Sequence, residues 1–383
     1  MPYAFTLDDV AFLRSADGER ALAACAELPL TDRIAGVAAV RKLVGERFAA
    51  VLETVLLRRK GKLDRSWLYT GDALQQASAP PVARHRAARL AGRDVHDVTC
   101  SIGADLVELA LLARRCIGSD LDPVRLAMAR HNSAGSAAVL VQADALKPVS
   151  RDAVIVADPA RRDSAGRRTW RPADFAPPLD ELAEVYAGRD LAVKCAPGLD
   201  PAAVPWAAEI ELVSLDGQVR EACVWSAGLA TASRRATVLR SDGTQWTITD
   251  RDPSGTGAAA PGEWIIDPDG AVVRAGLVKH YAARHGLWQL DERIAYLTGD
   301  RPPSGVRAFR VQEHGPYQEK SLRALLRARD VGRLEILVRG LDVDPDALRK
   351  RLKLTGAGEA GVVLTRIGRS PHFFLCRAER VPG

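Results

Sequence analysis

Cysteine is scarce in this sequence of 383 residues. The six cysteines are scattered along the chain, at Cys25, Cys100, Cys116, Cys195, Cys223 and Cys376. No two of them form a C-x-x-C pair, and none groups with the seven histidines in a metal-binding pattern. The pattern argues against a zinc site and is typical of reduced thiols in a cytosolic protein. We therefore expect no bound metal.

Targeting segments are missing as well. The first residues, Met1–Val10, lack the basic start and the apolar core of a signal peptide. No apolar run approaches the roughly 18 residues that a membrane-spanning helix needs. These absences predict a cytoplasmic protein with no membrane partner.

A complete dinucleotide fingerprint, G-x-G-x-x-G, is also absent. No His or Tyr stands in an obvious catalytic context. A nicotinamide-dependent dehydrogenase is therefore disfavoured.

The composition that is present describes a globular chain, with 47% hydrophobic and 27% charged residues. Its length favours two or three domains. The net charge of +6 is uneven, because residues 301–383 hold 17 basic and 9 acidic side chains. A basic surplus of this kind suggests a polyanionic partner, although solvated helix faces look similar.

Helical and strand patterns divide the chain into four predicted regions. Residues 1–81 read as a helical region, with helices over Asp8–Ala26 and Arg33–Arg59 and a break at Pro80-Pro81. Residues 82–228 alternate strand and helix, as in a parallel doubly wound sheet. A helix is expected over Leu106–Arg115. The strands are expected at Val95–Cys100, Cys116–Asp120, Ala138–Gln142, Ala153–Asp158, Leu191–Cys195, Glu209–Leu215 and Val219–Ser226.

The last two of these strands, joined by Asp216-Gly217, predict a terminal antiparallel hairpin. Residues 229–304 are a mixed connecting region with a flexible stretch at Ser254–Gly262. Residues 305–383 predict a small α+β domain in the order β-α-β-α-β-β. Its elements are expected at Val306–Val311, Ser321–Ala328, Leu334–Val338, Pro345–Leu352, Val362–Ile367 and Phe373–Arg377.

The turn after the first strand carries small residues, Ser101, Gly103 and Ala104. A nucleotide-like cofactor needs close backbone approach and a helix N-terminus at this place. A tight turn without a ligand is the alternative, since only one glycine is present.

Acidic residues end the next strands. Asp120 lies about 20 residues beyond the turn, where a carboxylate can bind ribose hydroxyls. Asp122, followed by Pro123, is better explained as a helix N-cap. Asp144 follows the third strand and could receive the amino group of an adenine, or cap a loop.

The fourth strand stops at Asp158-Pro159-Ala160-Arg161. A carboxylate there faces the ligand crevice of an open sheet and can accept hydrogen bonds from an amine. The following loop, Arg161–Arg171, has five arginines and Trp170, a combination that suits phosphate contact and base stacking, unless the loop is simply solvated. Cys195, beside Lys194, could be a nucleophile, but a buried inert thiol is the simpler interpretation.

With these motifs the chain resembles class I S-adenosylmethionine-dependent methyltransferases, specifically the bacterial family with a THUMP-like C-terminal domain. The resemblance rests on segments that cover most of the chain: Ala73–Ala87, Asp97–Asp105, Gly118–Pro123, Gln142–Leu146, Asp158–Arg161, Asp216–Glu221, Asp267–Val278 and Arg339–Leu354. It implies a Rossmann-like seven-stranded methyltransferase domain after the helical region, a small C-terminal domain, and RNA, either tRNA or rRNA, as the partner.

The resemblance also implies a set of site residues. The cofactor, S-adenosylmethionine, is expected to contact Asp97, Thr99, Ser101, Gly103, Asp120, Leu121, Asp144, Ala145 and Asp158. The chain departs from the family where Ser101 and Ala104 replace glycines, and where an Asp-Pro-Ala-Arg step replaces Asp-Pro-Pro-aromatic.

The leading hypothesis is methylation of an exocyclic base amine in RNA, guanine N2 or adenine N6, with Asp158, Pro159 and Arg161 as catalytic residues. RNA contacts are expected from Arg161, Arg162, Arg167, Arg168, Trp170, Arg349, Lys350 and Lys353. In the tail, Leu348, Leu352 and Leu354 would face the core and leave the neighbouring cations in solvent. Two alternatives stay open: C5-uracil methylation through Cys195, and a non-catalytic RNA-binding protein.

Overall fold

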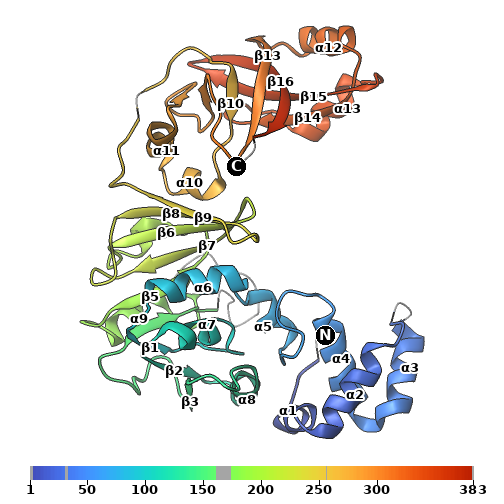
Figure 1. The fold of residues 1–383 in the computed structure, drawn as a ribbon, viewed down its shortest axis with the longest axis vertical. Coiled ribbons are helices and arrows are strands. Elements are labelled where there is room, and N and C mark those ends of the chain that lie inside the picture. The colour runs from blue at the N-terminus through green and yellow to red at the C-terminus, as the bar shows by residue number, and fades with distance from the viewer. Residues whose placement is uncertain (1–2, 31–32, 161–173, 256, 382–383) are drawn as a thin grey trace. The chain divides into compact units, whose positions relative to one another are not determined.

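The computed structural model describes residues 3–30, 33–160, 174–255 and 257–381 (Figure 1). The chain divides into two compact units. The first comprises Met1–Asp216, Arg220–Thr231 and Leu239–Thr244, and the second comprises Gly217–Val219, Ala232–Val238 and Gln245–Gly383. No helix within the described ranges is both long and apolar enough to cross a membrane.

Short helices form the amino-terminal part of the first unit. They are α1 (Leu7–Leu13), α2 (Ala16–Ala26), α3 (Arg33–Val44), the 3-10 turn η1 (Gly45–Arg47), α4 (Phe48–Arg58) and α5 (Gly71–Gln76). Both long helices predicted from the periodicity are therefore wrong in extent. Ser15 interrupts the first, because its side chain caps α2 by accepting from the Gly18 amide. Gly45, with a φ of 62°, ends α3.

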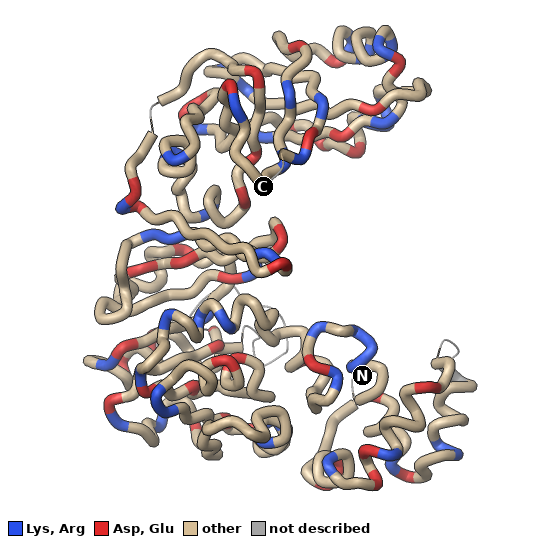
Figure 2. The backbone as a smooth tube through the Cα atoms, viewed as in Figure 1, with Lys and Arg blue, Asp and Glu red and all other residues tan. Residues whose placement is uncertain are grey.

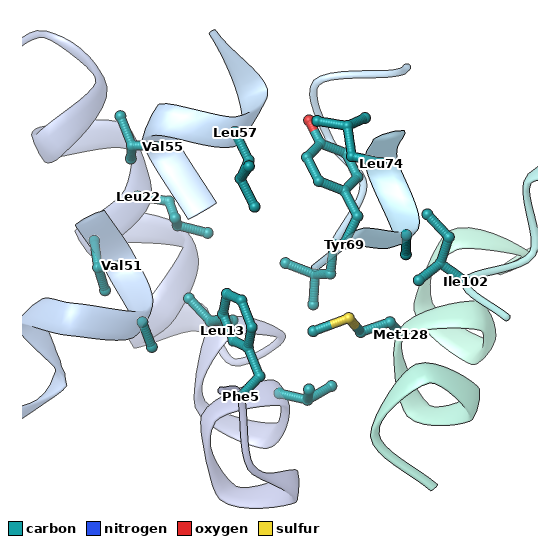
Figure 3. Packing of buried hydrophobic residues seen from close by; sticks show 14 of the residues in the cluster. Phe5, Leu13, Leu22, Val51, Val55, Leu57, Tyr69, Leu74, Ile102 and Met128 are labelled. Atoms are coloured by element: carbon teal, nitrogen blue, oxygen red, sulfur yellow. The ribbon is translucent and has the colours of Figure 1, made fainter. Parts of the chain in front are cut away.

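These helices share an apolar core with the sheet domain (Figure 3). Leu13, Val51 and Leu57 from the helices belong to the same buried cluster as Ile102 and Met128. Each Å² of apolar surface removed from water contributes roughly 25 cal/mol, so this shared core stabilises the packing of the helices on the sheet domain.

The sheet domain begins with α6 and alternates strands with helices. Its elements are α6 (Pro80–Arg89), β1 (Asp94–Asp97), α7 (Ala104–Leu112), β2 (Arg115–Asp120), α8 (Pro123–Asn132), β3 (Val139–Gln142), β4 (Val154–Ala157), α9 (Leu179–Val185), β5 (Leu191–Cys195), the turn η3 (Pro201–Ala203), β6 (Glu209–Leu215) and β7 (Gln218–Trp225). The predicted helix over Leu106–Arg115 ends earlier, at Leu112, because Arg115 already belongs to β2.

Strands β1 to β5 are parallel, and β7 runs antiparallel to β5. The strand order is β3-β2-β1-β4-β5-β7-β6-β8-β9. The chain reverses direction along the sheet between β1 and β4, so the crevice for a ligand lies at the carboxyl ends of these strands.

The predicted hairpin exists, with Asp216 and Gly217 both at positive φ, as a type I′ turn requires. It is not terminal, however. Strands β8 (Arg234–Leu239) and β9 (Gln245–Thr249) extend the sheet beyond β6, so seven expected strands become nine.

The second unit contains a seven-stranded sheet in the order β11-β12-β10-β13-β16-β15-β14. Its elements are β10 (Trp264–Ile266), α10 (Gly270–Arg274), α11 (Val278–His285), β11 (Trp288–Gln289), β12 (Leu297–Gly299), β13 (Arg307–Pro316), α12 (Glu319–Ala328), β14 (Val331–Val338), α13 (Pro345–Leu352), β15 (Gly358–Ile367) and β16 (Ser370–Arg380). From β13 onward this is the predicted β-α-β-α-β-β order. Leu348 and Leu352 of α13 are fully buried, as their helical spacing predicts.

Candidate active site

A cavity of about 390 Å³ lies at the carboxyl ends of the parallel strands, a volume within the range of small-molecule sites. Eight of the nine residues predicted to contact a cofactor line it: Asp97, Thr99, Ser101, Asp120, Leu121, Asp144, Ala145 and Asp158. The ninth, Gly103, is the N-cap residue of α7 directly beside it. The structure thus brings the set together, while contact with a cofactor stays a prediction.

The turn after β1 has the backbone that close approach requires. Gly103 adopts a φ of 87°, and Ser101 adopts a φ of 49°, which a non-glycine residue rarely takes. Asp120 holds this turn, because its Oδ2 accepts from the Ser101 amide at 2.9 Å. Its Oδ1 accepts from the Asp122 amide, also at 2.9 Å. Asp120 therefore supports the turn as well as facing the cavity.

Asp122 caps α8, as predicted, since its Oδ1 accepts from the amides of Val124 and Arg125. Asp144 turns one oxygen to the Leu146 amide at 3.0 Å and still lines the cavity. Asp120 and Asp144 thus each have a local structural role, and their remaining lone pairs can accept from a ligand.

Carboxylates outnumber cations around this cavity. Its acidic lining residues are Asp97, Asp105, Asp120, Asp144 and Asp158, and its basic lining residues are Arg86 and Arg125. Burial and the nearby carboxylates raise the pKa of Asp97 well above its usual value. Burial also raises the pKa of Asp120. A cationic ligand would relieve this crowding of negative charge.

Leu121 is 67% exposed, although it is a large apolar side chain at the rim of the cavity. An exposed leucine has no special meaning alone. At this position, next to Asp120 at the end of β2, it offers an apolar surface that a ring of a ligand could contact.

Asp158 directly follows β4 and is held on two sides. Its amide donates to Thr99 Oγ1 at 2.7 Å, and its Oδ2 pairs with Lys194 Nζ at 2.6 Å. Lys194 also donates to the Gln76 carbonyl at 3.0 Å. Burial opposes the charge on Lys194, but three carboxylates outweigh it and raise the pKa of Lys194. These carboxylates belong to Asp158, Asp105 and Glu221.

Sequence reasoning missed this role of Lys194, which it considered only as an activator of Cys195. Successive side chains of a strand point to opposite faces, so the two residues cannot serve one reaction centre together. Cys195 is buried in β5, where it pairs with Ala222 of β7, and it does not line the cavity. The available signal was a lysine inside the otherwise apolar run of β5.

Arg86 was missed as well. It is buried in α6 and pairs with Asp105 of α7 and with Glu221 of β7. Burial alone would raise the pKa of Asp105, but the Arg86 and Lys194 charges hold it below its usual value. The two ion pairs join three of the segments that carried the family resemblance: Ala73–Ala87, Asp97–Asp105 and Asp216–Glu221.

The predicted RNA contacts divide into two groups. Arg161, Arg162, Arg167, Arg168 and Trp170 lie outside the described residues. In the tail, Lys350 and Lys353 are exposed, and Figure 2 shows further basic positions on several elements of the second unit.

Arg349 is exposed, as its helical spacing predicts, but it also has partners within the protein. Its Nε donates to the Leu334 carbonyl at 3.1 Å, and its Nη1 pairs with Asp346. Arg351 likewise pairs with Glu319 at 3.0 Å. Spacing along α13 exposes these residues, but it could not show that other elements supply partners.

The first seven strands, in the order β3-β2-β1-β4-β5-β7-β6, and the acids at their carboxyl ends define a Rossmann-like methyltransferase domain. Comparison with known proteins agrees. Two strains of Mycobacterium tuberculosis, CDC 1551 and H37Rv, carry an uncharacterised S-adenosylmethionine-dependent methyltransferase that is 54% identical over 362 residues. The match covers 89% of this chain and 100% of the relative.

The chain belongs to the S-adenosylmethionine-dependent methyltransferases. Residues 306–378 match the family model described as THUMP domain-like, and residues 6–61 match a domain of unknown function. A crystal structure of a protein from Porphyromonas gingivalis W83 designated a methyltransferase has the same fold, with a TM-score of 0.76 and 21% identity. That match covers 98% of this chain and 99% of the other.

The residues present fit this cofactor. S-adenosylmethionine carries a sulfonium and an ammonium, and the surplus of carboxylates around the cavity complements both. Asp120 and Asp144 would hold its nucleoside part, and Leu121 would contact a ring of that part. The turn from Ser101 to Gly103 would let the ligand approach the backbone closely.

Proposed function

We propose that this enzyme methylates an exocyclic amine of an RNA base, guanine N2 or adenine N6. One observation carries the proposal: the position and partners of Asp158 at the carboxyl end of β4. Asp158 lines the cavity, and its Oδ2 pairs with Lys194. Its Oδ1 has no hydrogen-bond partner among the residues that the structure describes. A carboxylate oxygen with free lone pairs is an acceptor for an amine proton.

Bound S-adenosylmethionine supplies an activated methyl group. The chain's own part is to position the amine nitrogen, since correct orientation is the main requirement of the transfer. Asp158 Oδ1 and the Pro159 carbonyl would accept the two amine protons and aim the nitrogen lone pair at the methyl carbon. As the N–C bond forms and the S–C bond breaks, the nitrogen gains positive charge that Asp158 stabilises. One proton then leaves the nitrogen, and the Asp158 carboxylate can receive it.

Lys194 fixes Asp158 for this task. Its ammonium compensates one oxygen and is itself tied to the Gln76 carbonyl, so the carboxylate cannot rotate freely. We expect Asp158→Ala to abolish methyl transfer while cofactor affinity stays within roughly tenfold. Asp120→Ala is the matched opposite, with cofactor binding weakened by about 1–3 kcal/mol.

Isothermal titration with S-adenosylmethionine measures both variants against the unaltered chain. Loss of all cofactor affinity in Asp158→Ala would move this residue from the amine site into the cofactor site. Absence of binding by the unaltered protein at millimolar cofactor would overturn the assignment of the cavity itself.

RNA as the substrate class is supported by the THUMP-like match over residues 306–378 and by the basic surplus of the tail. Lys350 of α13 and Lys353 at its C-cap are exposed and, within the part of the chain that the structure describes, form no ion pair, so they are suited to phosphate contact. Reversing both, in Lys350→Glu/Lys353→Glu, should weaken RNA binding and flatten its salt dependence by roughly 0.7 per lost contact. The exposed Lys147→Glu in the first unit is the control.

Mass spectrometry of modified nucleosides in total RNA decides the reaction. A deletion strain should lack an N2-methylguanosine or N6-methyladenosine that its parent contains. If all methylated nucleosides persist at parental levels, RNA is not the substrate.

No observation favours C5-uracil methylation, because a covalent mechanism needs a cysteine that reaches the substrate and Cys195 is buried. Full activity of Cys195→Ser would end that alternative. Family membership favours an enzyme over a non-catalytic RNA-binding protein.

A further inference from the structure

A second cavity, of about 270 Å³, is also lined by Asp158. It shares Gln76, Ala77, Asp158 and Ala160 with the cofactor cavity. A group bound in it is therefore next to the carboxylate that faces the reaction. We call it the cationic cavity, after Lys62, Lys194 and Arg220, which line it together with Glu221.

The charges of this cavity do not cancel locally. Asp158 is paired with Lys194, and Glu221 is paired with Arg86. Within the described part of the chain, Lys62 and Arg220 form no ion pair. Two cations thus remain without a carboxylate partner at one cavity, the reverse of the acid surplus in the cofactor cavity.

Lys62 is held in place rather than free to swing into solvent. Its Nζ donates to the carbonyls of Leu74, at 2.7 Å, and Gln75, at 2.9 Å. An ammonium has three donors, so one N–H remains. Burial above all, and then the charges of Lys194 and Arg220, lower the pKa of Lys62 to about 8.

The neighbouring helix start does not supply the donors. Helix α6 begins with Pro80 and Pro81, which have no amide hydrogen, and the Val82 amide already donates to the Ala79 carbonyl. An anion in this cavity would therefore be recognised by side chains. An ammonium and a guanidinium together suit a phosphate, the guanidinium in bidentate fashion.

We propose that the cationic cavity binds a phosphate of the RNA backbone flanking the target base, through Lys62 and Arg220. This rests on the proposed function, since it assigns the anion to a nucleotide. The phosphate contact would place the base so that its amine can reach Asp158, which lines both cavities. Lys62 and Arg220 are positioning residues, because they touch the phosphate and not the reacting atoms.

The test compares guanosine and adenosine with their 3′- and 5′-monophosphates, titrated into the full chain saturated with S-adenosylhomocysteine. We expect a monophosphate to bind roughly tenfold or more tightly than its nucleoside, the effect of one or two charge-assisted hydrogen bonds. Lys62→Gln/Arg220→Gln should reduce this ratio to about twofold or less. Arg84→Gln, an exposed arginine of α6, should keep it.

Two further readouts separate binding from folding. Cofactor affinity and thermal unfolding of the double variant report whether it folds, and the single Arg220→Gln, at an exposed position, should show part of the loss. The phosphate advantage should also fall between pH 7 and pH 9, because Lys62 loses its proton near pH 8 while the phosphate stays doubly charged.

Equal binding of nucleoside and monophosphate, or no binding of either at roughly 10 mM, overturns the proposal. So does a phosphate advantage that survives in the double variant. A phosphate advantage that depends on Lys62 and Arg220, but with no methylated nucleoside lost in the deletion strain, leaves the anion site standing and overturns the RNA function alone.

Discussion

Replacing Arg86 by methionine tests whether the buried charge network holds the active site together. Arg86 is 3% exposed and is the partner of Asp105 and Glu221. Methionine retains an unbranched apolar stem and removes only the guanidinium, so the cavity left behind is small. The variant isolates the charge.

The size of the effect follows from what the variant leaves behind. Removing one partner of a buried ion pair typically costs about 3–5 kcal/mol, because a charge stays buried without compensation. Here Ser78 Oγ still donates to Asp105 at 3.0 Å, and the charge of Lys194 still acts on both carboxylates. We therefore expect a loss near the lower end, about 3 kcal/mol of unfolding free energy.

The loss should depend on pH. Without Arg86, the pKa values of Asp105 and Glu221 rise in the folded state, so the folded variant binds more protons than the unfolded chain. Stability then decreases as the pH rises. The deficit should be smaller at pH 5 than at pH 8.

The assay is urea unfolding at pH 5 and pH 8. If the two units unfold in separate transitions, the one that shifts when S-adenosylmethionine is added belongs to the methyltransferase unit. The triple variant Arg86→Met/Asp105→Asn/Glu221→Gln removes the stranded charges and should regain at least half of the loss. Arg84→Met, an exposed position on the same helix, should cost less than about 0.5 kcal/mol. A deficit below about 1 kcal/mol for Arg86→Met, or no recovery in the triple variant, refutes the reasoning.

Three further perturbations probe single residues. Ser101→Gly should raise the unfolding free energy by about 1 kcal/mol, because Ser101 holds a left-handed φ of 49°. A lower unfolding free energy of the variant, measured with urea, would contradict this. Asp97→Asn should stabilise the protein without cofactor and weaken cofactor binding, because the raised pKa of Asp97 indicates an unfavourable buried charge. Thermal unfolding with and without S-adenosylmethionine separates the two effects. His96 has a pKa of about 4, below the unfolded 6.5, so the unfolded chain binds more protons between these values. Stability should thus fall by on the order of 3 kcal/mol from pH 6.5 to pH 4, a slope that His96→Gln should lose.

Much of the fold could be predicted because apolar runs of four to eight residues identify buried strands. Strand β5 was placed at its observed bounds, and β2 began one residue earlier than predicted. Strand β1 ends at Asp97, although the apolar pattern continues to Cys100. The residues after Asp97 leave the ladder to form the cofactor turn, and hydrophobicity alone does not record that change of direction. For the same reason the helical period ran through Ser15 and Gly45 without marking the breaks.

The acids of the site could be predicted because parallel strands bring their carboxyl ends to one edge. Asp120 and Asp158 needed only the strand order to be placed together. The cations could not be predicted in this way. Arg86 meets Glu221 across 135 residues, and Lys194 meets Asp158 across 36. Such pairings are made by tertiary packing, which leaves no local pattern in one sequence.

The two cavities that Asp158 lines differ in the sign of their surplus charge, and this difference would direct each ligand of the reaction to its own cavity. The cofactor cavity is rich in carboxylates and would admit the cationic methyl donor, whereas the cationic cavity would repel it. An anionic substrate would face the reverse preference. Asp158 lines both cavities and Lys194 lines the cationic cavity, so their ion pair lies where the two ligands would meet. The raised pKa of Asp97 indicates that the charge of this buried carboxyl is unfavourable in the protein alone, and a cationic cofactor bound in the cavity would offset that cost.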